Sequence, residues 1–183
     1  MSPQVPNEAY YTFAGEIDQR AVNRIFGSLN IAVNNGVEKV HLLVQSFGGI
    51  VDDGIAVYNY LTHLPLTVVT YNEGAVQSIA VLMYLAGEVR VCAENASFLI
   101  HKTTFTFQGA TTAEMMRGRA DNAENCDQKT DAMLRGHITM PEEKWALRDK
   151  LDLTLSANEA KEYGLVHSIG HFAVPKGCQV FNI

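Results

Sequence analysis

The sequence has few cysteines and a shortage of positive charge, and each shortage excludes a class of protein. The cysteines Cys92, Cys126 and Cys178 match neither a disulfide framework nor a paired metal-binding motif, so we expect reduced thiols in a cytoplasmic protein. Lys and Arg number 14 against 20 Asp and Glu, which gives a net charge of -6. Because phosphate binding needs a basic face, this balance argues against a nucleic-acid partner.

Long apolar runs and a leader pattern are also lacking. The run from Ile79 to Ala86 is far too short to span a bilayer, so no membrane partner is expected. The segment Met1 to Glu8 is polar, with neither the basic nor the apolar part of a signal peptide. Repeats and linkers are absent too, and 183 residues fit a single domain over 1–183.

Apolar strands alternate with amphipathic helices along the chain. A strand is expected over Val40–Val44, followed by a turn at Gly48-Gly49 and a helix over about Val51–Thr62. Further strands are expected over Leu66–Tyr71, Val89–Cys92 and Phe98–Ile100. This alternation favours an α/β fold with a mostly parallel sheet covered by helices. In such sheets, functional sites lie where the carboxyl ends of strands meet the N-termini of helices.

The second half of the chain contains a long polar helix, expected over about Thr112–Arg135. Its apolar residues form one narrow stripe, made of Ala113, Met116, Ala120, Ala123 and Cys126. Such a stripe predicts contact along one side only, with another subunit or equally with the helix's own domain.

Near the C-terminus, Ser156 to Glu159 forms a capping-box pattern and Gly164 a helix stop. The extended run Leu165–Ile169 then predicts a late strand, and Asp152 lies just before the short helix.

Ser78 and His101 form a candidate pair of nucleophile and base. Ser78 is expected to open an apolar helix after a turn at Gly74, where unpaired N–H groups favour a developing oxyanion. His101 ends a later strand and would supply the base that a serine hydroxyl needs. Taken alone, however, such a serine is more typical of a helix cap, and the Gly-x-Ser-x-Gly elbow is lacking.

Four motifs, in the same order, resemble those of the Clp protease proteolytic subunit (ClpP) family. Ser46-Phe47-Gly48-Gly49 is similar to the family's Ser-Pro-Gly-Gly loop, and the segment from Gly74 to Ser78 to its Gly-x-Ala-Ala-Ser. His101, followed by Phe107-Gln108-Gly109, resembles the family's strand-ending histidine and its Phe-Gln-Gly. Asp152 stands where the family has an aspartate, just upstream of the long matching run Leu155–Val166.

The resemblance implies a ClpP/crotonase-like fold with a protruding handle-type helix in the region of about 103–137, and a serine endopeptidase. Ser78 would attack the peptide carbonyl, His101 would transfer the proton, and Asp152 would orient the imidazole. The resemblance also assigns the backbone N–H groups of Gly49 and Ile79 to the oxyanion hole, and Gly48 and Gln77 to substrate binding. It implies no metal and no organic cofactor, a peptide or unfolded protein as substrate, and a homo-oligomer built as a heptameric ring or double ring.

Several positions depart from the family pattern. Phe47 replaces a proline, Val76-Gln77 replaces two alanines before the serine, and Lys102-Thr103 replaces Gln-Pro after the histidine. A first strand reached by about Tyr10 leaves little room for an axial segment, so the docking of an AAA+ unfoldase stays open. The alternative function is a non-proteolytic ClpP/crotonase-group protein, either an acyl-thioester enzyme or a catalytically silent structural subunit. The complete triad favours hydrolysis.

Overall fold

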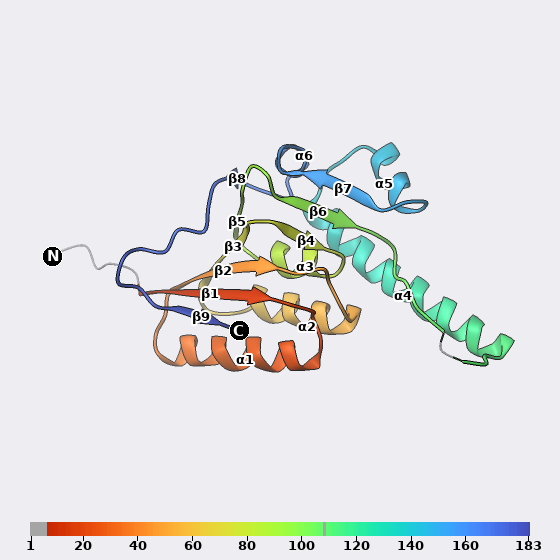
Figure 1. The fold of residues 1–183 in the computed structure, drawn as a ribbon, viewed down its shortest axis with the longest axis horizontal. Coiled ribbons are helices and arrows are strands. Elements are labelled where there is room, and N and C mark those ends of the chain that lie inside the picture. Colours follow the sequence, from red (N-terminus) through yellow and green to blue (C-terminus); the bar gives the residue numbers. More distant parts are fainter. Residues whose placement is uncertain (1–6, 108) are drawn as a thin grey trace.

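A six-stranded parallel sheet forms the centre of the computed structural model, which describes residues 7–107 and 109–183 (Figure 1). The strand order is β8-β5-β3-β2-β1-β9, and each neighbouring pair runs parallel. The strands are β1 (Glu8–Ala14), β2 (Lys39–Gln45), β3 (Thr67–Asn72), β5 (Val89–Cys92), β8 (Ser168–Ile169) and β9 (Val180–Asn182). The expected mostly parallel α/β sheet is therefore confirmed.

Helices α1 (Gln19–Asn34) and α2 (Val51–Thr62) lie together along one face of this sheet (Figure 1). The α2 helix has the expected bounds, whereas α1 was not anticipated. The Asp18 side chain caps α1 by accepting a hydrogen bond from the Ala21 N–H at 2.8 Å. The helix then buries one stripe at helical spacing, made of Ala21, Val22, Ile25, Leu29 and Ala32.

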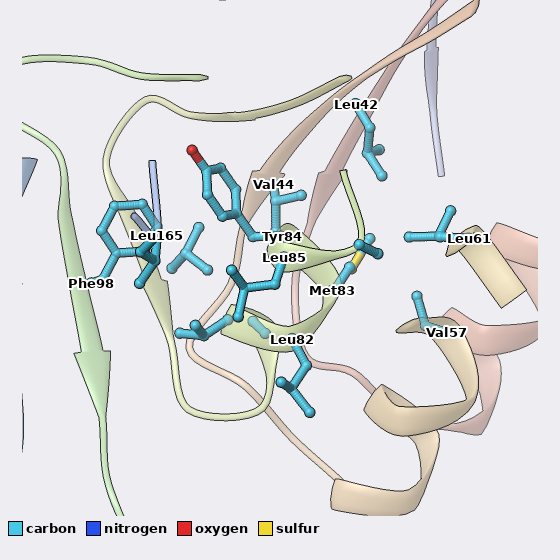
Figure 2. Close-up of a cluster of buried hydrophobic side chains, with 14 of the residues drawn as sticks. Leu42, Val44, Val57, Leu61, Leu82, Met83, Tyr84, Leu85, Phe98 and Leu165 are labelled. Atoms are coloured by element: carbon cyan, nitrogen blue, oxygen red, sulfur yellow. The ribbon is translucent and has the colours of Figure 1, made fainter. Parts of the chain in front are cut away.

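The short helix α3 (Ala80–Leu85) lies inside the core, and each of its residues is buried. Figure 2 shows its side chains among those of β2 and α2, including Leu42, Val57 and Leu61. The Tyr84 ring packs on Phe98 with ring centroids 5.1 Å apart, and its hydroxyl donates to the Val91 carbonyl at 2.9 Å. Each such buried large apolar side chain contributes about 1.5–3 kcal/mol to folding, so α3 is fixed in place by its surroundings.

A second, three-stranded sheet contains β4 (Ala75–Gln77), β6 (Ser97–Ile100) and β7 (Leu153–Ser156). The strand expected at Phe98–Ile100 is confirmed, whereas β4 and β7 were not anticipated. The prediction that Ser78 opens a helix is wrong, because Ser78 lies in a turn between β4 and α3, which begins at Ala80. The reason is that β4 pairs with β6 and also bridges to Ser46, which holds this segment extended up to Gln77.

Helix α4 (Ala113–His137) extends away from the sheets, as Figure 1 shows in blue-green. Its C-terminal half packs on its own domain through Ala123, Cys126, Thr130 and Leu134. Of the expected apolar stripe, only Ala123 and Cys126 are buried, and the N-terminal half is exposed. Within the residues described, no helix has both the length and the apolar character needed to cross a membrane.

Two short helices, α5 (Glu142–Arg148) and α6 (Ala157–Glu162), flank β7. The expected capping box at the start of α6 is present, and Gly164 after its end has a φ of +81°. The expected strand over Leu165–Ile169 is reduced to Ser168–Ile169. This correction has a physical cause: the Val166 N–H donates to the Ala160 carbonyl at 3.0 Å and the Leu165 carbonyl accepts from Arg90 Nε at 2.8 Å, so the start of the run is held by α6 and by a side chain, and pairing with β5 begins only at Ser168.

Candidate active site

The three-stranded sheet carries three candidate residues at one end. Ser78 directly follows β4, His101 directly follows β6, and Asp152 directly precedes β7. Leu99 of β6 aligns with Gln77 in the parallel pair, and Ile100 aligns with Leu153 in the antiparallel pair. Continuing the parallel pair by one residue places Ser78 beside Ile100, the end of β6. Continuing the antiparallel pair by one residue places His101 opposite Asp152. The topology thus gathers three positions that are far apart in the sequence.

Ser78 has a strained backbone. Its φ of 55° is the only positive value for a non-glycine residue in the described parts of the chain. The left-handed region costs such a residue on the order of 1–2 kcal/mol, and strain of this kind is concentrated at functional sites. Gly48 lies against this turn, because a Cβ built on it would stand 2.6 Å from Ser78 Cβ. Glycine at position 48 therefore lets the loop approach the serine.

Ser78 and His101 line one small pocket, with a volume of about 80 Å³. Besides these two, the pocket is lined by Gly49, Val51, Ile79, Leu82, Ile100, Lys102, Thr103, Thr104, Thr130, Leu134 and Arg148. Gln77 and Asp152 do not line it, and Val76 is fully buried in the core. The side chain of Val76 therefore occupies space in the core and does not narrow the pocket.

Two backbone N–H groups in the pocket wall are without acceptors. Within residues 7–107 and 109–183, no hydrogen bond uses the N–H of Gly49 or that of Ile79. The loop before them is held firmly, since the Ile17 N–H donates to the Gly48 carbonyl at 2.9 Å and the Ile50 N–H to the Ile17 carbonyl at 2.8 Å. Fixed, unpaired donors beside a serine can stabilise an oxyanion.

The imidazole of His101 has a backbone partner. Its Nδ1 lies 2.6 Å from the Lys102 carbonyl oxygen. Because a carbonyl oxygen only accepts hydrogen bonds, Nδ1 carries a proton, and in the neutral imidazole Nε2 is then the acceptor. Asp152 is exposed, and in the described part of the chain it makes no hydrogen bond with His101. The structure thus places Asp152 in register with His101, but the two side chains are not joined.

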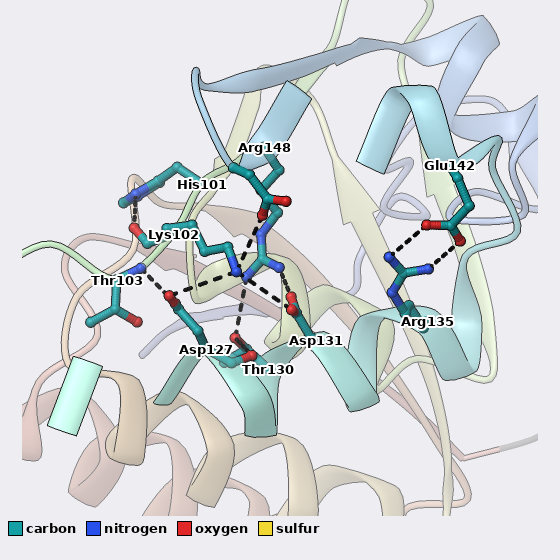
Figure 3. Close-up of polar contacts among 10 residues, drawn as sticks. His101, Lys102, Thr103, Asp127, Thr130, Asp131, Arg135, Glu142 and Arg148 are labelled. Atoms are coloured by element: carbon teal, nitrogen blue, oxygen red, sulfur yellow. Dashed lines mark hydrogen bonds and ion pairs between the residues drawn. The ribbon is translucent and has the colours of Figure 1, made fainter. Parts of the chain in front are cut away.

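A cluster of charged groups surrounds Lys102, which sequence reasoning had noted only as a departure from the family (Figure 3). Lys102 Nζ lies 3.3 Å from Asp149, 3.6 Å from Asp131 and 3.9 Å from Asp127. The buried Arg148 pairs with Asp131. Burial lowers the pKa of the Arg148 guanidinium, while Asp127 and Asp149 oppose this shift. Sequence reasoning missed these contacts because the groups come from the segment after β6, from α4 and from α5 with its C-cap, which meet only in the fold.

Other reactive groups fit catalysis less well. Burial, assisted by Glu73, raises the pKa of the Cys92 thiol to about 11. Near neutral pH this thiol is therefore protonated and a poor nucleophile. Among the residues that the structure describes, no group of three or more His, Cys, Asp and Glu side chains is arranged to hold a metal ion.

The sequence and the fold are similar to those of known proteins. The model of the Clp protease family matches residues 4–172. The "ATP-dependent Clp protease proteolytic subunit 2" of Treponema pallidum (strain Nichols) is 28% identical over 159 residues, covering 85% of this chain and 79% of that protein. The solved structure of a ClpP1 point mutant from Listeria monocytogenes superimposes with a TM-score of 0.77 at 21% identity, covering 91% of this chain and 92% of the other.

Proposed function

The chain belongs to the Clp protease family, and from this premise we propose that it is a serine peptidase that cleaves peptide bonds through Ser78, His101 and Asp152. The observation that carries the proposal is the composition of one pocket wall. Ser78, His101 and the unpaired N–H groups of Gly49 and Ile79 all line the same cavity. A nucleophile, a base and an oxyanion site are the parts that acyl transfer requires.

In the proposed reaction, His101 Nε2 takes the proton from the Ser78 hydroxyl as its oxygen attacks the substrate carbonyl. The carbonyl π electrons move onto oxygen, and the N–H groups of Gly49 and Ile79 stabilise that negative charge. The imidazolium then gives its proton to the leaving amine, and an acyl-enzyme remains on Ser78. Water cleaves this ester by the same steps in reverse order. Gly48 and Gln77 would hold the substrate chain beside the pocket.

The role of Asp152 in this proposal is to accept the Nδ1–H of His101 when the imidazole becomes charged. The register of β6 and β7 supports it, because the two residues occupy opposing positions just past the Ile100–Leu153 pair. A carboxylate stabilises an imidazolium better than a neutral carbonyl does, since charge-assisted hydrogen bonds are roughly twice as strong. Both acceptors select the same tautomer of His101, so exchange between them leaves Nε2 free.

We also propose that this single domain acts in the cytoplasm as a subunit of a ring-shaped homo-oligomer that receives peptides or unfolded proteins. The exposed half of α4 supports this assembly, because Met115 is 59% and Met116 48% exposed there. The Treponema pallidum relative is named as a proteolytic subunit of an ATP-dependent protease, and this name supports a subunit role. The same name is the reason to test an ATP-dependent unfoldase as a partner.

Labelling by a fluorophosphonate tests the nucleophile. The wild-type protein should be labelled, and Ser78→Ala should abolish labelling, because the probe captures only an activated serine. Ser28→Ala, on helix α1 away from the pocket, is the matched control and should label normally.

Labelling that survives Ser78→Ala would reject the assignment, and so would a folded wild-type protein that never reacts. In the latter case calorimetry with an acyl-CoA analogue is the next measurement. Tight binding without peptide cleavage would support the acyl-thioester enzyme instead.

A further inference from the structure

We propose that Lys102 is a positioning residue for His101: its carbonyl oxygen holds the imidazole Nδ1–H, and its ammonium group anchors that carbonyl to carboxylates of α4 and of the α5 C-terminus. The catalytic consequence of this inference rests on the proposed function. The contact itself does not, because it is a feature of the fold.

The segment after His101 needs an anchor. Strand β6 ends at Ile100, and the chain from His101 to Phe107 belongs to neither a helix nor a strand. No strand ladder therefore fixes the carbonyl of Lys102, although that carbonyl lies 2.6 Å from His101 Nδ1. A peptide that orients a proton-transferring imidazole must be held within a fraction of an ångström, so other contacts have to replace the ladder.

The side chain of Lys102 supplies such contacts. Its ammonium group lies 3.3–3.9 Å from the carboxylates of Asp127, Asp131 and Asp149. Figure 3 shows the contacts with Asp127 and Asp131, the two aspartates of α4, as dashed lines. Asp127 also accepts the Thr103 N–H at 2.7 Å. One carboxylate of α4 thus contacts both the side chain of Lys102 and the next backbone amide, and these two contacts bracket the Lys102 carbonyl.

This cluster differs from an ordinary surface ion pair. Exposed pairs contribute little, because solvent screens them and two long side chains lose freedom. The difference lies on its inner side: the Lys102 side chain is 36% and its nearest partner Asp149 61% exposed, but Asp127 is only 15% and the neighbouring Arg148 only 3% exposed. Arg148 pairs with Asp131 and lines the same pocket, so the Asp131 carboxylate is held from the buried side. A rigid set of acceptors can therefore restrain the lysine and the peptide that carries it.

Two readouts test the inference. The first is the tautomer of His101, measured in protein with 15N-labelled histidine by long-range 1H–15N correlation and assigned with His101→Gln. The second is the rate of fluorophosphonate labelling at Ser78. In the wild type we expect the Nδ1–H form to dominate. Lys102→Met, which keeps the length but removes the charge, should give a mixture of tautomers and slow labelling on the order of tenfold.

Three further variants make the test specific. Lys102→Arg keeps the charge and should restore both the tautomer and the labelling rate, which general destabilisation would not explain. Lys129→Met removes a lysine of α4 that pairs with Asp52 at 3.6 Å, and should change neither readout. Asp149→Asn removes the carboxylate nearest to Lys102 and should act in the same direction as Lys102→Met, which keeps the test valid if that variant does not fold.

The outcomes separate this inference from the proposed function. A folded Lys102→Met protein with wild-type tautomer and labelling rate would overturn the role of Lys102. A tautomer that changes in a protein whose wild type is never labelled would uphold the contact and reject the peptidase. Labelling that depends on Ser78 but not on Lys102 or Asp149 would support the peptidase and reject the role of Lys102.

Discussion

Gly54 of α2 shows how closely the backbone must approach the turn that carries Ser78. A Cβ built on Gly54 would overlap Ile79 Cγ1, and Ile79 is one of the two pocket-lining residues whose N–H makes no hydrogen bond in the described parts of the chain. Gly48 touches the same turn from the other side. The position of the turn therefore depends on the absence of two side chains, as well as on the presence of the serine.

Replacing Gly54 with alanine should destabilise the protein by about 1–3 kcal/mol, because the new methyl group overpacks a buried contact. This sign is opposite to the usual gain of up to about 1 kcal/mol when alanine replaces a helical glycine. Urea unfolding measures the effect.

Gly27→Ala is the matched control for this prediction. Gly27 is an exposed glycine of α1, and a Cβ there would meet nothing within 4 Å. It should raise the urea midpoint. A Gly54→Ala protein as stable as Gly27→Ala would show that Ile79 yields without cost.

At the scale of elements, α5 and α6 are joined by one carboxylate. Glu159 closes the capping box of α6 by accepting the Ser156 N–H at 3.0 Å, and its other oxygen accepts from Lys144 Nζ of α5 at 2.7 Å. The bond from Lys144, followed by those from Ser156, lowers the pKa of Glu159 from 4.5 to about 2. This carboxylate therefore fixes the two helices that flank β7, the strand following Asp152.

Replacing Glu159 with glutamine should lower the free energy of unfolding at neutral pH by about 1 kcal/mol, because glutamine can still accept the Ser156 N–H but lacks the charge that Lys144 and the helix N-terminus stabilise. Because the folded pKa lies below the unfolded one, the stability due to Glu159 is complete above about pH 4.5. It is lost as the pH falls towards about 2, so the two proteins should converge there.

Denaturant titrations at several pH values measure this convergence. Glu162→Gln, which changes an exposed glutamate of the same helix, is the control and should match the wild type throughout. A constant difference between Glu159→Gln and the wild type across the whole range would contradict the linkage.

At the scale of the whole molecule, the fold separates a compact body from one projecting arm. The two sheets and the helices packed on them form the body, and the N-terminal half of α4 projects from it (Figure 1). That half carries the exposed Met115 and Met116, and Phe105 and Phe107 lie exposed in the segment before it. Apolar side chains on a projecting helix favour burial against another copy of the chain.

Placing charge on this arm should therefore dissociate the proposed homo-oligomer. The double variant Met115→Glu with Met116→Glu should sediment as a smaller particle than the wild type, because carboxylates cannot be buried there without partners. Analytical ultracentrifugation measures the change.

Ile31→Glu serves as the control, since Ile31 is 61% exposed on α1, away from the arm. It should leave the mass of the particle unchanged. An arm variant with the sedimentation of the wild type would exclude α4 as the contact.

The elements that the sequence predicted well are those whose pattern is local. The bounds of α2 and the capping box of α6 depend on residues within a few positions of one another, and so does the apolar run of β2, which only His41 interrupts. The structure departs from prediction where distant groups decide. Strand β4 exists because of its pairing with β6, and the Leu165 carbonyl accepts a hydrogen bond from the side chain of Arg90, which is remote in sequence.

The candidate site divides in the same way. Ser78, His101 and Asp152 were found from motifs, which preserve residue types at fixed spacing. Lys102 and its carboxylates were not predicted as a group, because their meeting depends on how α4 and α5 pack against the end of β6.

The sequence by itself determined the alternation of strands and helices, the family and the identity of the candidate nucleophile and base, because each of these follows from local patterns. Only the tertiary structure decided that Ser78 stands in a strained turn instead of a helix, and that His101 Nδ1 faces the Lys102 carbonyl. The physical reason is that strand register and side-chain partners are set by contacts between distant segments, whose free energies no local pattern records.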